Sequence, residues 1–292
     1  EEVMQRITAG GGGAFLHPTH NLNDHLRKVE DEDLDLKAVY PDKETSWKLS
    51  FKNMLFPYLN PGFSFFVGMY YLLLTWVLET DASRGAASLL EQLSEIGGLW
   101  LAFDAFFHVL IRSPLAFILG MLLVASFTWF ADENAGKSKY TWIIGFLHGG
   151  LHLVVCSLLI WGFATVNLSY LELEVISIIQ VVLFAVEMTV IGSICGGILV
   201  GLYLMTSNLV LGIHDNESFS ALHEEDYKNF LRFHLTPTQL TLYSIGIKRV
   251  NKHWERKGKF AFNGELPKAH LIEPPVILKT TKARQLERNV SE

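Results

Sequence analysis

The sequence predicts a mainly α-helical, multi-pass membrane protein with a small α+β module at its C-terminal end. Four long apolar runs without Lys or Arg lie between Pro57 and Gly212. Half of all residues are hydrophobic and only 18% are charged. The charged residues gather in the segments on either side of the apolar middle, which favours a membrane domain with polar flanks over one globular domain.

Each apolar run is long enough to cross a bilayer as a helix. The runs cover residues 63–78, with further apolar residues on the N-terminal side of this first run, then 115–131, 142–166 and 173 to beyond 203. A hydrocarbon core of about 30 Å needs about 20 apolar residues in a helix, which satisfies its own backbone groups. Barrel strands alternate in polarity and these runs do not. The alternative is a large soluble protein with buried helices, but such a core seldom shows four such runs in one chain.

Between the first two runs, residues 86–95 and 99–111 have the pattern of shorter helices. The second of these, LWLAFDAFFHVLI, is too short to span comfortably and carries Asp104 and His108 four residues apart, hence on one helical face. We expect it to be an interfacial or re-entrant helix that ends at Arg112. A fifth crossing is the alternative.

The distribution of cations favours four crossings with both ends in the cytoplasm. The N-terminal flank, the second loop and the tail are basic, with Lys43, Lys48, Lys52, Lys137 and Lys139 in the first two of them. The first loop has only Arg84 and Arg112, and the third has neither Lys nor Arg. Four crossings place the basic regions on one side, which the positive-inside rule assigns to the cytoplasm.

Ionisable residues at membrane depth point to function or pairing. The third run carries HGGLH, in which two histidines share a face and two glycines permit close helix approach. We predict a set of N and O ligands for a zinc-like ion, formed by Asp104, His108, His148, His152 and Glu187. Two alternatives stay open: a hydrogen-bonded cluster that holds the helices in register, and a proton path.

The C-terminal tail predicts a small α+β module over residues 213–278. Residues 220–235 are expected to form a helix and residues 240–250 a strand, with a further strand interrupted by Pro274 and Pro275. Residues 279–292 are polar and expected to be disordered. The net charge of −6 gives no reason to expect nucleic acid as a partner. Both cysteines lie in apolar runs and are expected to be packing residues.

The N-terminal stretch ITAGGGGAFLHPTH predicts a short strand followed by a tight glycine turn. His17 and His20 are spaced so that they could share a metal ion. This stretch resembles the segment that closes the catalytic domain of calcineurin-like metallophosphoesterases, in a membrane-attached branch of that family. The tail segments ALHEEDYKNFLRFHL and LTLYSIGIKRV also look like that branch.

The resemblance implies a specific division of the chain. Residues 1–20 would end an α/β catalytic domain, 21–56 would be a charged connector, and 57–212 the transmembrane domain. The family's metal motifs D-x-H, G-D-x-x-D, G-N-H and G-H-x-H are absent, so the chain looks like a piece of a longer protein and no catalytic residue is carried over. His17 and His20 would lie near the missing active site.

The sequence therefore predicts a membrane anchor for a metal-dependent phosphoesterase. Its parent would use two divalent metal ions, and its partners would be the lipid bilayer and its own upstream catalytic domain. Two other readings remain: a membrane-embedded hydrolase or transporter-like protein that uses the intramembrane His, Asp and Glu residues, and a purely structural anchor. The sequence predicts neither a substrate nor an oligomeric state.

Overall fold

The computed structural model describes residues 6–10, 13, 15–29, 32–85, 88–133, 140–252 and 266–279. The chain divides into two compact units. We call Lys52–His214 the helical unit, and we call the two segments Glu1–Phe51 and Asp215–Glu292 together the flank unit. Two parts of the sequence predictions lie outside the described residues. They are the second-loop cations Lys137 and Lys139, and residues 280–292 of the tail that was expected to be disordered.

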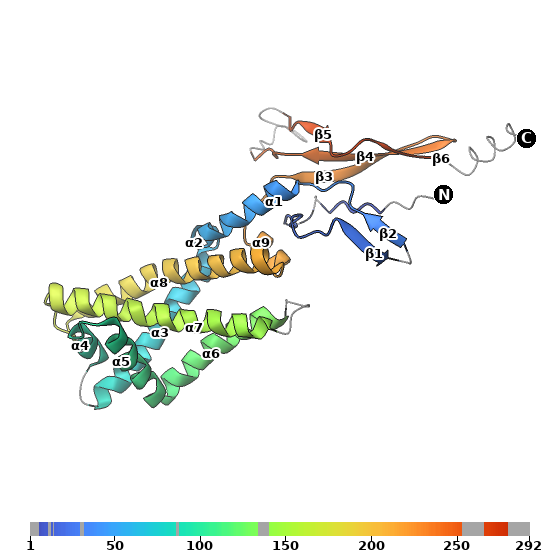
Figure 1. The fold of residues 1–292 in the computed structure, drawn as a ribbon. Helices are drawn as coiled ribbons and strands as arrows, with labels where there is room; N and C mark the ends of the chain where they lie inside the picture. The colour runs from blue at the N-terminus through green and yellow to red at the C-terminus, as the bar shows by residue number, and fades with distance from the viewer. Residues whose placement is uncertain are drawn as a thin grey trace, which may run out of the picture. The chain divides into compact units, whose positions relative to one another are not determined.

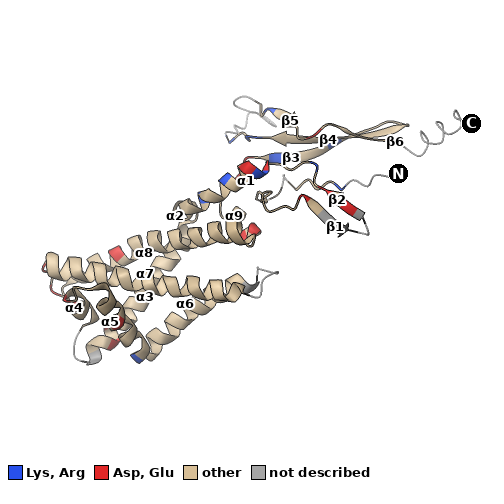
Figure 2. Ribbon diagram, viewed as in Figure 1, with Lys and Arg blue, Asp and Glu red and all other residues tan. Residues whose placement is uncertain are grey.

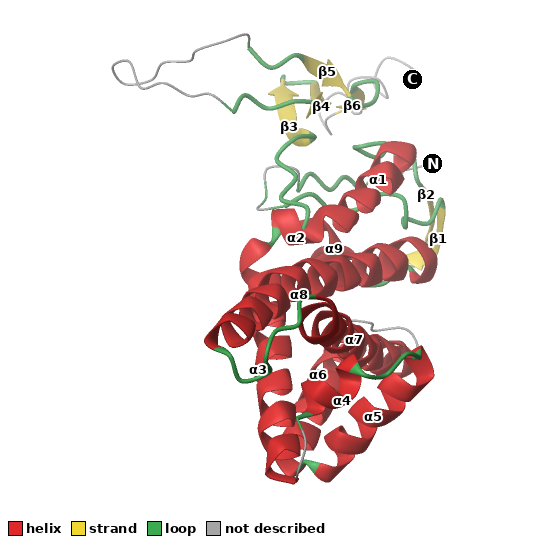
Figure 3. Cartoon of the chain, turned by 90° about the vertical axis from the view of Figure 1, so that its left-hand side faces the viewer, coloured by secondary structure: helices red, strands yellow, loops and turns green. Residues whose placement is uncertain are grey.

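The helical unit contains four helices that are long and apolar enough to cross a membrane (Figures 1 and 3). Its elements are η1 (Phe51–Leu55), α2 (Phe56–Leu59), α3 (Pro61–Gly85), α4 (Leu89–Ser94), α5 (Leu99–Arg112), α6 (Pro114–Glu133), α7 (Thr141–Ala164), η2 (Thr165–Tyr170), α8 (Ile178–Thr206) and η3 (Ser207–Leu211). The four long helices α3, α6, α7 and α8 are drawn almost wholly in tan in Figure 2, because they carry very few charges.

The predicted apolar runs agree with these helices, apart from their ends. The fourth helix begins at Ile178 and not at 173, because the Ser177 side chain caps it by accepting a hydrogen bond from the Gln180 amide. α7 and α8 both end in a π-helical turn, η2 and η3. The extra length that the sequence showed after residue 203 is therefore helix as far as Leu211.

Glycines bring the long helices into close contact. A Cβ atom built on Gly201 of α8 would lie 2.0 Å from the Asn53 carbonyl oxygen, and one on Gly68 of α3 would lie 2.4 Å from the Thr189 carbonyl oxygen. On α7, a Cβ atom on Gly149 would lie 2.7 Å from Val124 Cα, on α6. No side chain fits at these positions without a shift of the backbone, so the predicted tight contacts along residues 192–201 and at Gly149 are confirmed.

The predicted short helix 99–111 forms as α5 and ends at Arg112, where the amide of the capping residue Ser113 donates to the Val109 carbonyl. Its buried side chains are Ala102, Phe106 and Leu110, which recur every four residues. Asp104 lies two residues after Ala102, and a step of two residues turns about 200° around a helix of 3.6 residues per turn. Asp104 therefore points away from the face that packs on the bundle.

The flank unit combines a hairpin, two short helices and an antiparallel sheet. Its elements are β1 (His25–Val29), β2 (Glu32–Asp35), α1 (Lys43–Ser50), α9 (Asp215–Ser220), β3 (Lys228–Leu235), β4 (Gln239–Ile247), β5 (Ala269–Leu271) and β6 (Val276–Lys279). β1 pairs with β2. In the sheet, β4 is central, with β3 on one side and both β5 and β6 on the other.

Residues from both ends of the chain build one core in the flank unit. Leu16 and Leu49 from the N-terminal segment pack with Phe219 and Leu222 from the C-terminal segment. The Asn21 side-chain amide donates to the Asp215 carboxylate at 2.8 Å. Tyr40 packs over Gly246 of β4 and has its ring 5.3 Å from that of His270 on β5. The two flanking segments are thus one folding unit and not two separate domains.

Two expectations about the flanks are wrong. Residues 220–235 do not form one helix: α9 ends at Ser220 and residues 228–235 form β3, because KNFLRFHL pairs along its whole length with β4. The charged connector predicted at residues 21–56 contains the hairpin of β1 and β2 and the helix α1. No strand forms among the described residues at 6–20. The strands predicted at 240–250 and around Pro274–Pro275 are confirmed as β4, β5 and β6.

Candidate functional site

The HGGLH motif lies on the buried face of α7. His152 is completely inaccessible and His148 is 7% exposed. They occupy the stripe that also contains Gly145, Gly149 and Cys156, at the three- and four-residue spacing of one helical face. Because this stripe packs against neighbouring helices, both imidazoles lie inside the helical unit.

His152 is held by residues from two other helices. Its Nδ1 atom shares a hydrogen bond with the Tyr71 hydroxyl of α3, at 2.5 Å. The Phe127 ring of α6 stacks on the imidazole at a centroid distance of 4.3 Å and an interplanar angle of 7°. Tyr71 is itself fully buried. These contacts hold the ring at one edge and on one face.

His148 lies between the pair formed by Tyr71 and His152 and a second hydrogen-bonded pair. Its ring stacks on Tyr203 of α8 at 4.4 Å and lies 4.8 Å from the His152 ring. The Tyr203 hydroxyl and His214 Nε2 are 2.9 Å apart and share a hydrogen bond. His214 follows η3 and is 2% exposed. We call Tyr71, His152, His148, Tyr203 and His214 the imidazole–phenol cluster.

Within the described part of the chain, Nε2 of His148 and Nε2 of His152 are buried and lack a hydrogen-bond partner. A buried polar atom without a partner costs about 1–3 kcal/mol by protein mutational data. Such an atom calls for an explanation, for instance a bound water or ion, or a role in chemistry. Two of them on adjacent rings make this the strongest candidate site of the helical unit.

The structure does not gather the five predicted metal ligands. His148 and His152 are neighbours, but Asp104 and His108 are exposed on the outer face of α5. The Glu187 carboxylate accepts a hydrogen bond from the Asn167 side-chain amide at 2.7 Å. Among the described residues, no three His, Cys, Asp or Glu side chains are placed to hold one metal ion. The geometry offers a pair of imidazoles and not a set of three or four ligands.

The phenols and the third imidazole of the cluster were not predicted from the sequence. Tyr71 lies in an apolar run beside a second tyrosine, and nothing in the sequence distinguishes the two. His214 lies in the polar break that follows the fourth run. Spacing along one helix shows which residues share a face, but it does not show which faces of different helices meet. A buried tyrosine needs a partner for its hydroxyl, which is the sequence signal that could have suggested a link between Tyr71 and a buried histidine.

His17 and His20 have different surroundings in the flank unit. His20 Nδ1 lies 2.8 Å from the Ser46 hydroxyl of α1, which also accepts a hydrogen bond from the Thr19 amide at 2.9 Å. His17 is exposed, with its ring 5.1 Å from that of Phe15. His20 thus attaches this segment to α1. The contact described for His17 is with the neighbouring Phe15 ring and does not attach the segment to α1.

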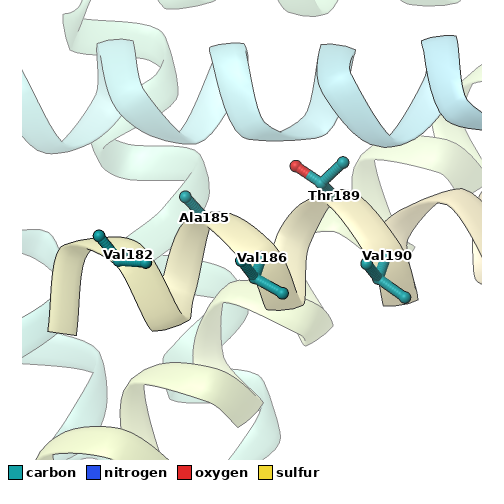
Figure 4. Close-up of a pocket in the computed structure, with 5 residues that line it drawn as sticks. All are labelled: Val182, Ala185, Val186, Thr189 and Val190. Carbon is teal, nitrogen blue, oxygen red and sulfur yellow. The ribbon is translucent and has the colours of Figure 1, made fainter. Parts of the chain in front are cut away.

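A shallow groove on α8 is apolar and holds no titratable group. Figure 4 shows its lining residues, which are Val182, Ala185, Val186, Thr189 and Val190. The Thr189 hydroxyl lies 3.8 Å from the Met69 sulfur of α3. A groove of this composition suits an acyl chain or a packed side chain, and it supplies no chemistry.

Comparisons with known proteins leave the chain without an assigned relative. No family model, no curated protein and no solved structure matches it. The function therefore has to be argued from the residues and their geometry.

Proposed function

We propose that the chain is an integral membrane platform that anchors and positions a cytoplasmic phosphoesterase domain. One observation carries the platform: the segments on either side of the helical unit share a single core, in which Leu16 and Leu49 pack with Phe219 and Leu222. Two segments that share a core lie on the same side of any membrane that the helical unit crosses.

A common side for both flanks requires an even number of crossings. The four long helices satisfy this requirement. α5 has 14 residues, which at 1.5 Å per residue gives about 21 Å, well short of a hydrocarbon core of about 30 Å. We therefore propose four crossings, with α5 inside or beside the bundle.

The cations assign the side. The flank unit contains Lys43 and Lys48 on α1, next to the start of the helical unit at Lys52, and the C-terminal segment is rich in Lys and Arg. Loops and flanks that carry this excess stay in the cytoplasm. Both ends of the chain are then cytoplasmic.

The phosphoesterase part of the proposal rests on the resemblance of ITAGGGGAFLHPTH and of the two tail segments to the calcineurin-like family. Enzymes of that kind polarise a phosphate and activate a water molecule with two metal ions. Those two ions would belong to an upstream catalytic domain, since the family's ligand motifs are absent here. His17 and His20 would lie at the edge of that domain.

Purified chain in lipid vesicles tests this proposal. It should stay with the membrane through alkaline carbonate washing, and it should hydrolyse neither a phosphomonoester nor a phosphodiester in the presence of Mn²⁺, Zn²⁺ or Mg²⁺. Extraction by carbonate would contradict the platform. Metal-dependent turnover that is lost in both His17→Ala and His20→Ala would place the active site in this chain and overturn the division of labour.

A second candidate is favoured by the unpartnered Nε2 atoms of His148 and His152. In this alternative the helical unit is a transporter-like protein or membrane-embedded hydrolase that loads a proton or a zinc-like ion at the two imidazoles. Elemental analysis of purified protein and proton uptake by vesicles test it, with His148→Phe and His108→Phe as a matched pair of buried and exposed variants. If no metal is found, and if the unmodified chain and both variants take up protons equally, this candidate is rejected and the purely structural anchor remains.

A further inference from the structure

One half of the flank-unit sheet has a wholly apolar face. In the β3–β4–β6 register, Phe233 pairs with Leu242 and Leu242 with Val276. The next row on the same face pairs Leu235 with Leu240 and Leu240 with Leu278. Directly paired residues in a sheet point to the same side, so these six side chains form two rows across β3, β4 and β6. We call them the apolar face.

The apolar face is open within the described structure. Leu235 is 72% exposed, Phe233 58% and Leu278 41%, whereas Leu242 on the central strand is only 8% exposed. A sheet with one apolar face normally buries that face against another layer. The other half of the same sheet face has such a cover, since Tyr40 packs over Gly246. The apolar face therefore calls for an occupant.

Residues on the opposite face and on the two outer strands indicate the charge of that occupant. Arg232 on β3 and Lys279 on β6 are exposed, and His234 and Gln239 lie on the same side as these cations. Residues 228–243 and 276–279 contain no Asp or Glu. Glu273, which precedes β6, is already engaged, since it accepts a hydrogen bond from the Ser244 hydroxyl at 2.8 Å. Apolar side chains with cations on both outer strands match a surface that is apolar below and negatively charged above.

We propose that the apolar face is a lipid-binding surface that rests on the anionic cytoplasmic leaflet. Long Arg and Lys side chains can bury their stems and carry their charge to phosphate or carboxylate headgroups. Only α9 and one short loop separate the end of the helical unit, His214, from the start of β3, Lys228. This tether keeps the sheet at a high effective concentration near a bilayer. The inference rests on the proposed cytoplasmic side of the flank unit.

Position-specific fluorescence in the full chain tests the proposal. In a background with Cys156→Ala and Cys195→Ala, Leu235→Cys and His234→Cys are each labelled with an environment-sensitive dye. The two positions are adjacent on β3 and point to opposite faces, so they form a matched pair. The chain is reconstituted in phosphatidylcholine vesicles with and without phosphatidylserine, each doped with nitroxide-labelled lipid.

The dye at position 235 should shift to the blue and be quenched several-fold by nitroxide lipid, more strongly with phosphatidylserine, while the dye at 234 should respond little. Arg232→Gln with Lys279→Gln should remove the phosphatidylserine dependence. Equal responses at 234 and 235 would overturn the proposal. A dye at 235 that is shielded without nitroxide quenching would also overturn it, because a protein surface would then be the occupant.

Carbonate extraction of the same samples separates this inference from the function proposed above. A chain that stays in the membrane but shows no lipid contact at 235 leaves the platform intact and removes only the lipid-binding sheet. A chain that is washed off the vesicles removes the platform itself.

Discussion

The two units of this chain arrange polarity in opposite ways. In the helical unit the interior holds His152, Asn167 and Gln180, each with no exposed surface, while Trp76 on α3 is 60% exposed. In the flank unit, the largest fully buried side chain is Phe219, and the described charged residues of α1 are exposed or half-buried. A lipid-facing unit can leave large apolar side chains outside, because lipid tails are as apolar as the core.

The same contrast appears in what holds each unit together. Helices of the helical unit meet at glycines, where backbone touches backbone. The flank unit instead fills a small core with Leu and Phe side chains that come from both ends of the chain. Packing of small residues is the general substitute for the hydrophobic effect inside lipid, and burial of large side chains is its counterpart in water.

The largest effect is expected in the flank unit. Phe219→Ala leaves a cavity in a small core and should cost about 3–5 kcal/mol of the free energy of unfolding of that unit. Phe230→Ala removes the same ring from a site that is 46% exposed and should cost about 1 kcal/mol or less. Hydrogen exchange of the full chain in detergent would measure both. Loss of protection in α7 as well would show that the two units do not unfold separately.

A smaller effect is expected from one methyl group in the helical unit. Gly149→Ala forces its Cβ against Val124 of α6 and should cost about 1–3 kcal/mol. Gly150→Ala is the matched control, because a Cβ there has nothing within 4 Å, and it should be neutral or stabilise the helix by up to about 1 kcal/mol. Thermal unfolding followed by circular dichroism would compare them. Equal costs at both positions would contradict packing through Gly149.

The imidazole–phenol cluster gives a still smaller expected effect. Tyr71→Phe leaves His152 Nδ1 without its hydrogen bond and should cost about 1–2 kcal/mol. Tyr71→Phe with His152→Phe removes both partners, so a purely structural pair predicts a double variant no worse than the single one. A functional pair predicts that the double variant is stable but inactive in proton uptake. The same thermal unfolding experiment supplies the stability values.

The smallest effect is expected at the start of α1. Asp42 caps this helix, and hydrogen bonds from the Thr45 amide and hydroxyl lower the pKa of its carboxyl below the usual 3.8. A lowered pKa in the folded state means that the cap stabilises the flank unit above about pH 4, and that this stabilisation is lost as the pH falls through the folded-state pKa. Asp42→Ala should cost about 1 kcal/mol at neutral pH.

Asp42→Asn separates the cap from the charge. Asparagine caps about as well as aspartate, so this variant should keep most of the stability at neutral pH and lose the acid dependence. Hydrogen exchange of α1 at neutral pH and near pH 3 would measure both properties. The same acid loss in Asp42→Asn would assign it to another carboxylate.

The helical unit was predicted well from the sequence because its signals are local. Length and apolar composition define a spanning helix without knowledge of its neighbours. The glycines at 149 and 196–201 and the short helix α5 were readable for the same reason. Asp104 and His108 do share one face of α5, as their four-residue spacing predicts. Spacing alone does not show whether that face points inward, because this depends on how Phe106 and Leu110 pack.

The flank unit was predicted poorly because its signals are distant in the sequence. The segment 228–235 contains residues that suit a helix, and only its pairing with β4 makes it a strand. The core of Leu16, Leu49, Phe219 and Leu222 joins positions separated by the whole helical unit. No local pattern predicts such a core, so residues 21–56 were predicted only to be a charged connector.

The membrane topology tests the central claim most directly. Reporter proteins fused in turn to Glu1 and Glu292 and expressed in intact cells show on which side each end lies. Because both flanks fold into one unit and we propose four crossings, we expect cytoplasmic signals from both fusions. Signals from opposite sides would contradict it, since one folded flank unit cannot be divided by the membrane that its own helices span.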